Sequence, residues 1–167
     1  VERQLSRNRW RQVVQDVSQP ADVAQVVATG FHHRLLNIHL LLPFSFFEIE
    51  PRAANVFSFG NDIELNDDFF KSPRLVRHAK HYMAMVDRAI ALLGPDIELL
   101  TDILMELGRQ HSKFGVESSF YPPMGQALIH TMEEMLGDKF VSSAKDAWLE
   151  CYTALAYDMI RAKHSKA

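Results

Sequence analysis

The feature that most constrains this chain is a histidine placed on an apolar helical stripe. In the stretch LTDILMELGRQHSKFGV, residues 100–116, apolar residues recur at steps of three and four, which is the period of one helix face. His111 lies on this stripe, whose apolar members are Ile97, Leu100, Leu104, Leu107 and Phe114. Burying an imidazole without a hydrogen bond or a metal is costly. The sequence therefore requires a partner for His111.

A second stretch upstream repeats this pattern around His78. Its apolar stripe consists of Leu75, Tyr82, Met85, Ala89 and Leu92. The sequence thus predicts two helices that each direct one imidazole inward. Neutral imidazole is the commonest nitrogen ligand of transition metals and an axial ligand of haem iron. A single histidine on such a stripe is more often a hydrogen-bonded core residue, so an all-helical domain without a cofactor remains the alternative at this point.

Composition and charge limit the class of protein. The 167 residues, 47% of them hydrophobic, suit one domain spanning residues 1–167 with a sizeable core. A net charge of −3 does not indicate nucleic-acid binding, and no apolar run is long enough for a transmembrane segment. Cys151 is the only cysteine, which excludes an intrachain disulfide and fits a reducing, cytoplasmic location. The chain begins at Val1 rather than Met, which is compatible with a piece of a longer protein.

Start and stop signals divide the chain into about seven or eight helices, with no strand alternation. A first amphipathic helix is predicted from Arg3 to Val17, and a second helix begins at Pro20 and is long or broken around Pro43. Later helices are predicted to start at Ser72-Pro73, Pro95-Asp96, Pro122-Pro123 and Ser142 or Ser143, and to end at Gly94, Gly115 and Gly137. The fold class is therefore all-α.

Three stretches carry a family resemblance. LGRQHSKFGV, FYPPMGQALIHTMEEMLG and AWLECYTALAYDM resemble the proximal-histidine, seventh-helix and last-helix sequences of globins, most closely those like neuroglobin and globin X. Residues 51–57 resemble the short third helix of that family. The resemblance implies a globin fold packed around a haem pocket, with haem b as cofactor.

The resemblance also assigns roles to individual residues. It implies that His111 is the proximal iron ligand and that His78 is the distal residue, which either binds the iron or donates a hydrogen bond to a bound gas. His81 competes with His78 for the distal role, although its position near the edge of the stripe favours a haem propionate or solvent. The other residues implied to line the haem are Phe57, which would stack on the macrocycle, Tyr82, Leu107, Val116 and Tyr121, with Phe120 in place of Tyr121 if the register shifts by one.

One segment departs from the family pattern. About a dozen extra residues precede Phe47-Glu48-Ile49-Glu50-Pro51, as judged against the expected helix length. The residue that this helix contributes to the distal side is therefore unassigned, with Phe44, Phe46 and Phe47 as candidates.

These assignments lead to three functional hypotheses. Similarity to neuroglobin and globin X favours iron held by both His111 and His78. Such a protein would act in electron transfer, or in redox or gas sensing. Reversible oxygen storage or transport is the second hypothesis, and Tyr82 bears on it because its phenol either crowds the oxygen site or donates to the ligand. The third is nitrite or nitric oxide chemistry, which requires an external electron donor. The expected partners are an unidentified redox protein and the gases O2, CO and NO.

Overall fold

The computed structural model describes residues 41–57, 66–92 and 96–162, and within these ranges the backbone forms helices joined by turns. Residues 41–49 are helical. The later elements are η1 (Pro51–Phe57), α3 (Asp67–Phe70), α4 (Pro73–Leu92), α5 (Ile97–Lys113), η2 (Ser118–Phe120), α6 (Tyr121–Leu136), η3 (Gly137–Lys139) and α7 (Ser142–Ala162). The predicted all-α class is confirmed. The predicted helix from Arg3 to Val17 and the start of the second helix lie outside the described residues.

The helix starts follow from local capping chemistry. The backbone N–H of Leu75 donates to Ser72 Oγ at 3.4 Å, and the N–H of Leu99 donates to Asp96 Oδ1 at 3.0 Å. Each bond satisfies an N–H that has no partner inside its helix. Two prolines occupy the first turn of α6, where a missing N–H costs nothing. These starts are those that the sequence predicted.

Glycines end two of the helices, as predicted. Gly115 follows α5 with a φ of 82°, and Gly137 follows α6 with a φ of 54°. Only a residue without a Cβ adopts this left-handed backbone at low cost. Pro43 lies inside the helical stretch 41–49 and is buried there, so the proline does not end the helix at its own position. The residues before 41 are outside the described ranges.

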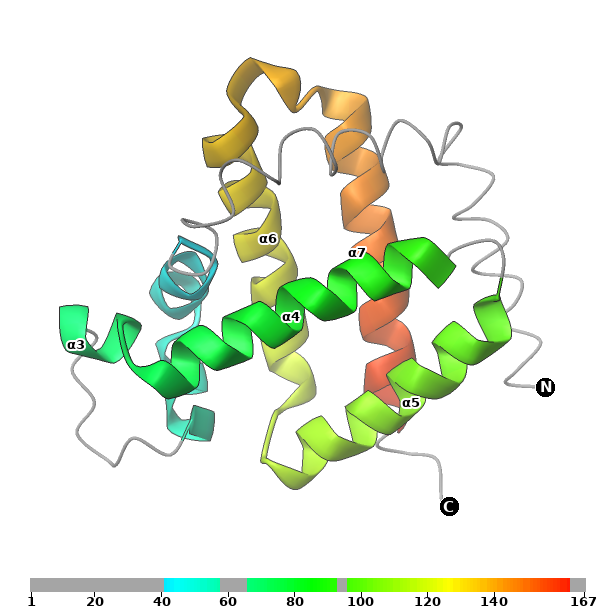
Figure 1. The fold of residues 1–167 in the computed structure, drawn as a ribbon, viewed down its shortest axis with the longest axis horizontal. Coiled ribbons are helices and arrows are strands. Elements are labelled where there is room, and N and C mark those ends of the chain that lie inside the picture. The colour runs from blue at the N-terminus through cyan, green and yellow to red at the C-terminus, as the bar shows by residue number, and fades with distance from the viewer. Residues whose placement is uncertain (1–40, 58–65, 93–95, 163–167) are drawn as a thin grey trace.

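The longer helices cross one another around a common interior. Figure 1 shows α6 and α7 side by side and antiparallel, with α4 crossing in front of them and α5 lying below α4. The most extensive contact between elements is that of α5 with α7, followed by that of α6 with α7. Crossed helices that pack in this way are the architecture expected of a globin.

Two of these crossings are close because glycine lies at the contact. A Cβ added at Gly108 of α5 would stand 2.2 Å from the backbone oxygen of Met159 in α7. At Gly125 of α6, it would stand 2.6 Å from the ring of Tyr152 in α7. The hydroxyl of Tyr152 also donates to the backbone oxygen of Tyr121, at 2.7 Å. Helix α7 is therefore held at backbone distance from α5 and by a hydrogen bond to the start of α6.

The buried side chains form three clusters. One joins residues 41–49 to α4, α6 and α7, with Leu42, Met83, Leu128, Met132 and Trp148 among its members. A second joins α4, α5 and α7 through Ala89, Leu100, Leu104, Cys151 and Ala154. The third surrounds η1 and consists of Phe47, Ala53, Ala54, Phe69, Leu75 and Phe120. Within the parts of the chain described here, no helix is both long enough and apolar enough to cross a lipid bilayer.

Candidate haem site

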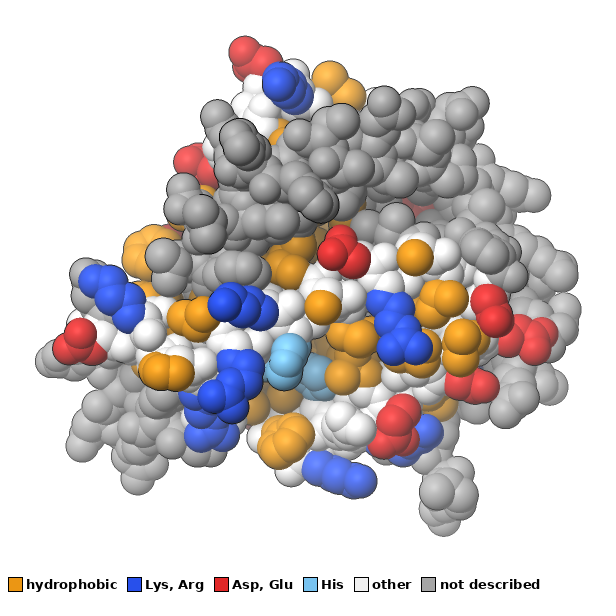
Figure 2. Space-filling model, in the orientation of Figure 1, with side chains coloured by type: hydrophobic (Ala, Val, Ile, Leu, Met, Phe, Trp, Pro, Cys, Tyr) orange, Lys and Arg blue, Asp and Glu red, His pale blue; other side chains and the backbone are white. Residues whose placement is uncertain are grey.

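The two predicted imidazoles come from α4 and α5. His78 belongs to the second turn of α4, and His111 is two residues before the end of α5. After burial, the electrostatic interaction with His111 is one cause of the lowered pKa of His78, so the two side chains lie near each other. Figure 2 shows histidine side chains at the centre of this face, between α4 and α5, with hydrophobic side chains on one side of them and Lys and Arg side chains on the other. The structure therefore brings the two histidines to one place.

His111 is fixed by its own helix. Its Nδ1 lies 2.9 Å from the backbone oxygen of Leu107, one turn earlier. A carbonyl oxygen only accepts, so Nδ1 carries the proton and donates, and Nε2 keeps its lone pair. The ring is half-buried, and burial lowers its pKa, although the bond to Leu107 opposes that shift. His111 thus presents a neutral ring with one nitrogen available for a metal, the arrangement found in metal-binding histidines.

His78 is held differently. Burial, followed by the charges of His111 and His81, lowers its pKa to about 4, so the ring is neutral near pH 7. The residue nevertheless has an exposed surface. Both observations agree for a side chain that protein atoms surround on several sides while one side stays open. The edge of its ring meets Phe57, with ring centroids 5.0 Å apart and planes at 83°.

Phe57 connects His78 to the cluster around η1. The ring of Phe57 is 5.6 Å from that of Phe47, again edge to face. Phe47, one of the three distal candidates, is 1% exposed, whereas Phe44 is 45% exposed and contacts Phe70. The third candidate, Phe46, is partly buried against the same cluster. Phe47 is therefore the candidate that reaches the predicted site through Phe57.

The remaining predicted residues are distributed around this centre. Val116, like Phe57, is half-buried against the cluster around η1, and Phe120 is a buried member of that cluster. Tyr121 lies instead beside Tyr152, and burial raises the pKa of its phenol to about 12. His81 is exposed, as His78 is, so exposure does not separate the two. Tyr82 packs against the cluster of α4, α6 and α7, and Leu107 supplies the carbonyl that holds His111.

The prediction for one residue of the His111 stripe is wrong. Phe114 was expected to face inward with His111, but it is 72% exposed. The physical reason is that α5 ends at Lys113 and Phe114 is its C-cap, with φ of −84° and ψ of 3°. Helical periodicity does not apply beyond the last helical residue, so an apolar residue at the next expected step need not face the same side.

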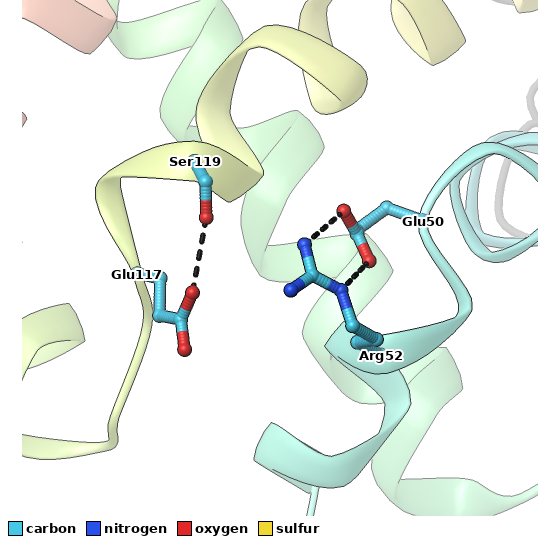
Figure 3. Close-up of polar contacts among 4 residues, drawn as sticks. All are labelled: Glu50, Arg52, Glu117 and Ser119. Carbon is cyan, nitrogen blue, oxygen red and sulfur yellow. Dashed lines mark hydrogen bonds and ion pairs between the residues drawn. The ribbon is translucent and has the colours of Figure 1, made fainter.

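The structure also contains a polar contact that the sequence did not indicate. Arg52 of η1 donates to both carboxylate oxygens of Glu50, from Nε and Nη2 at 2.8 Å each (Figure 3). The hydrogen bond and the charge of Glu50, with a smaller effect of Glu117, raise the pKa of Arg52. Glu117 precedes η2 and accepts from Ser119 Oγ at 3.1 Å. Arg52 also lies over the ring of Phe120, 5.8 Å from its centroid, so η1 is near the segment that follows His111, and no sequence spacing marks this proximity.

Comparison with known proteins identifies the fold. The sequence model of the globin family matches residues 44–159. The chain belongs to the globin family. It is 30% identical over 115 residues to neuroglobin of Tetraodon nigroviridis, covering 69% of this chain and 72% of that one, and equally to neuroglobin-2 of Oncorhynchus mykiss. To neuroglobin-1 of Oncorhynchus mykiss it is 29% identical over 124 residues, covering 74% of this chain and 77% of that one. Globins bind haem, whose iron takes small diatomic gases, so this globin is a haem protein.

The donor set of the site fits haem better than a bare metal ion. Among the described residues, no group of three or more His, Cys, Asp or Glu side chains could hold a metal ion. Two neutral imidazoles on facing helices leave at least two positions of any metal to be filled by another group. The four nitrogens of a porphyrin fill the plane between two axial ligands, and an aromatic ring such as Phe57 packs well against a flat macrocycle. The residues present therefore fit a haem.

Proposed function

We propose that this globin binds haem b between His111 and His78 and acts in electron transfer or in redox or gas sensing. The observation that carries the proposal is the pairing of two neutral imidazoles from α4 and α5, one of which has its Nε2 left available by the bond from Nδ1 to Leu107. Haem supplies an iron that changes oxidation state and binds gases on its axial positions.

Each residue has a distinct task in this proposal. His111 is the fixed ligand, because the bond to Leu107 sets both its tautomer and its ring orientation. His78 would be the second ligand and, lacking such a backbone tie among the described residues, would be the more easily displaced of the two. Phe57 holds the edge of His78 and, with Val116 and the buried Phe120, provides apolar surface that keeps water from the site.

Haem b rather than a covalently attached haem follows from the cysteine content. Attachment of a c-type haem uses two cysteines in a C-x-x-C-H motif. The 167 residues contain a single cysteine, Cys151, and it is buried on α7. The site would therefore retain haem without the two-cysteine attachment.

Two axial histidines favour electron transfer over gas storage. Imidazoles that stay bound in both oxidation states leave little structure to rearrange when an electron moves. A gas, in contrast, must wait for His78 to leave, so its apparent affinity falls with the fraction of open protein. Sensing uses this same competition, because displacement of His78 would move a side chain that contacts Phe57 and hence the cluster around η1.

The ferrous absorption spectrum, recorded with and without carbon monoxide, tests the proposal. Two histidine ligands predict a six-coordinate, low-spin spectrum in both the ferric and the ferrous form, converted slowly by carbon monoxide. A five-coordinate, high-spin ferrous spectrum would refute ligation by His78 while leaving the haem site intact. A haem-reconstituted protein that stays colourless would refute the site itself.

A stable oxygenated form is the observation that would favour the storage hypothesis. If the ferrous protein takes up oxygen and releases it when the oxygen pressure falls, without oxidising, His78 acts as a hydrogen-bond donor rather than as a ligand. Repeated turnover of nitrite or nitric oxide with an added reductant would instead favour the enzymatic hypothesis. Both measurements use the same reconstituted protein.

A further inference from the structure

The basic side chains of α4 are arranged differently from those of α5. Helix α5 has Glu98 in its first turn and His111 and Lys113 in its last turn, which is the order that the helix dipole favours. Helix α4 has no acidic residue in its first turn and no basic residue in its last turn, and Arg74 lies near its positively polarised start. The charges of α4 are therefore not placed to stabilise the helix.

These basic residues repeat along one exposed side of α4. Arg74, Arg77, His81 and Arg88 follow one another at steps of three, four and seven residues, so they form one row on the helix. All four are exposed, and so is Lys80 beside the row. Arg77 thus has a neighbour of like charge one turn away in each direction, which repels it. The basic face of α4 consists of Arg74, Arg77, Lys80 and His81.

Several basic residues of the other helices have acidic partners. The Nε of Arg109 is 3.0 Å from the carboxylate of Glu106, and a similar pair joins α6 to α7 through Glu133 and Lys145. Within residues 41–57, 66–92 and 96–162, Arg77 and Lys80 form no ion pair. The one acidic residue of α4 lies two turns beyond Lys80. Part of the basic face therefore carries charge that no carboxylate of the described chain neutralises.

The basic face borders the candidate haem site. His81 is a minor cause of the lowered pKa of His78, so the two side chains lie near each other, and Arg77 directly precedes His78. Figure 2 shows Lys and Arg side chains gathered on one side of the histidines. The whole chain has a net charge of −3, so this positive charge is local. It lies where His78 is exposed.

An acidic protein is the partner that fits this face. Surfaces of opposite charge steer two proteins together and fix their relative orientation. Small, polar interfaces are typical of weak electron-transfer complexes. A lipid surface fits less well, because helices that lie on membranes insert large apolar side chains. Among the described residues, none of the exposed large hydrophobic side chains belongs to α4.

We propose that the basic face of α4 docks an acidic electron-transfer protein against the open side of the haem site. The proposal rests on the electron-transfer function proposed above. The docked partner brings its own cofactor to the side on which His78 is exposed, and one electron passes from that cofactor to the ferric iron. The iron is reduced and the partner's cofactor is oxidised, and no bond forms or breaks between the two proteins.

Direct binding is the first test, with plant-type ferredoxin, a small acidic one-electron donor, as the probe. Ferredoxin is added to the ¹⁵N-labelled, haem-loaded protein, and the backbone amide resonances are followed. We expect shifts that centre on residues 73–81, that disappear in Arg77→Glu/Lys80→Glu, and that weaken as salt is added. Shifts centred on another helix, or the absence of any shift, would overturn the proposal.

The rate of haem reduction by reduced ferredoxin is the second test. Lys80→Glu and Lys139→Glu make the same charge change at exposed positions, the second in the turn between α6 and α7, away from the start of α4 (Figure 1). At about 0.1 M ionic strength charges act over about 10 Å, so the local charge decides. Electrostatic steering raises association rates by about 10- to 1,000-fold. We expect Lys80→Glu to lower the second-order rate constant by roughly three- to tenfold, and Lys139→Glu by less than about twofold.

A neutral reductant and a lipid surface separate the other roles of the basic face. The neutral semiquinone of lumiflavin should reduce all variants equally fast, and their haem content should be equal. Slower reduction by lumiflavin, or haem loss in Lys80→Glu, would mean that the basic face serves the haem, and the proposal would be wrong. Equal slowing by ferredoxin in both variants would leave only an effect of net charge, which also contradicts it.

Two further outcomes are distinct from these. Sedimentation with phosphatidylserine vesicles that requires Arg77, without amide shifts from ferredoxin, would identify a lipid surface as the partner and overturn the proposal. An unsubstituted protein that takes up no haem would refute the function proposed above, and electron delivery to this face with it.

Discussion

Helices α4 and α5 each contribute one imidazole to the same site, but they hold it in different ways. In α5, His111 is bonded to the backbone of its own helix through Leu107, and Gly108 lets the helix backbone contact that of α7. In α4, the ring of His78 packs nearly perpendicular to that of Phe57, and the residue is exposed. One imidazole is part of a rigid crossing, whereas the other stands at an open edge.

The difference indicates which ligand stays and which moves. If His111 binds the iron as proposed, its bond to Leu107 and the close crossing of α5 with α7 would favour its staying bound. A ligand held by a ring contact needs only a side-chain movement. In the proposed site, α5 would retain the haem, and α4 would carry the ligand that a gas displaces. The substitutions below test whether the two helices differ in this way.

Loss of the fixed ligand should have the largest effect. His111→Leu removes an imidazole whose orientation is set by a backbone bond, so we expect most of the haem to be lost from the purified protein. The ratio of the haem band to the protein band after gel filtration measures the loss. His130→Leu, at an exposed histidine of α6, is the matched control and should retain its haem. Equal retention by both variants would remove the distinction between α5 and α4.

Loss of the movable ligand should open the iron rather than empty the site. A minor open state is typically populated at 0.1–10%, so removing the competing imidazole should speed carbon monoxide binding by about 10- to 1,000-fold. We expect this for His78→Leu, with haem retained, in flash-photolysis or rapid-mixing measurements. His81→Leu, one turn away at an exposed position, should change the rate little. The reverse result would make His81 the distal ligand.

The close crossing of α5 and α7 should be sensitive to a single methyl group. A Cβ at Gly108 would stand 2.2 Å from the oxygen of Met159, so Gly108→Ala must move the helices apart. Overpacking of this kind costs about 1–3 kcal/mol, which we expect as a lower denaturation midpoint, with faster haem loss because α5 carries His111. Asp102→Ala, exposed on the same helix, should be close to neutral. Equal midpoints would show that α5 is no more rigidly placed than α4.

Local chemistry made much of this fold predictable. Ser72, Asp96 and Gly137 act within a few residues of their own position, so their effect on helix ends does not depend on the rest of the chain. The inward faces of α4 and α5 followed from the same helical period that placed His78 and His111 on apolar stripes. Phe114 failed because the period was extended past the end of its helix.

The contacts between distant segments were not predictable. Arg52 and Glu117 approach each other only after η1 and the segment behind His111 have been brought together by the packing around Phe120. The sequence also did not show which of the rings of Phe120 and Tyr121 packs in the cluster around η1, where the structure places Phe120. A single sequence specifies which residues face inward far better than which of them meet.

The smallest predicted effect concerns the thiol of Cys151 in α7. Cys151 is buried between α5 and α7, and burial raises its pKa from 9.0 to about 12. The unfolded chain therefore releases this proton at a lower pH than the folded chain, so stability falls as the pH rises from about 9 towards 12. For one such group the loss is about 1 kcal/mol between pH 8 and pH 10. Denaturation of the unsubstituted protein and of Cys151→Ala at both pH values measures it, and the variant should lose less.

The buried phenols sharpen this last comparison. Burial also raises the pKa values of Tyr121 and Tyr152, so part of the alkaline destabilisation should persist in Cys151→Ala. The prediction is the difference in stability loss between the unsubstituted protein and Cys151→Ala, not the absolute loss in either protein. If both lost stability in parallel, water would reach the thiol in the folded state. The side of the site that holds His111 would then be as open as the side that holds His78.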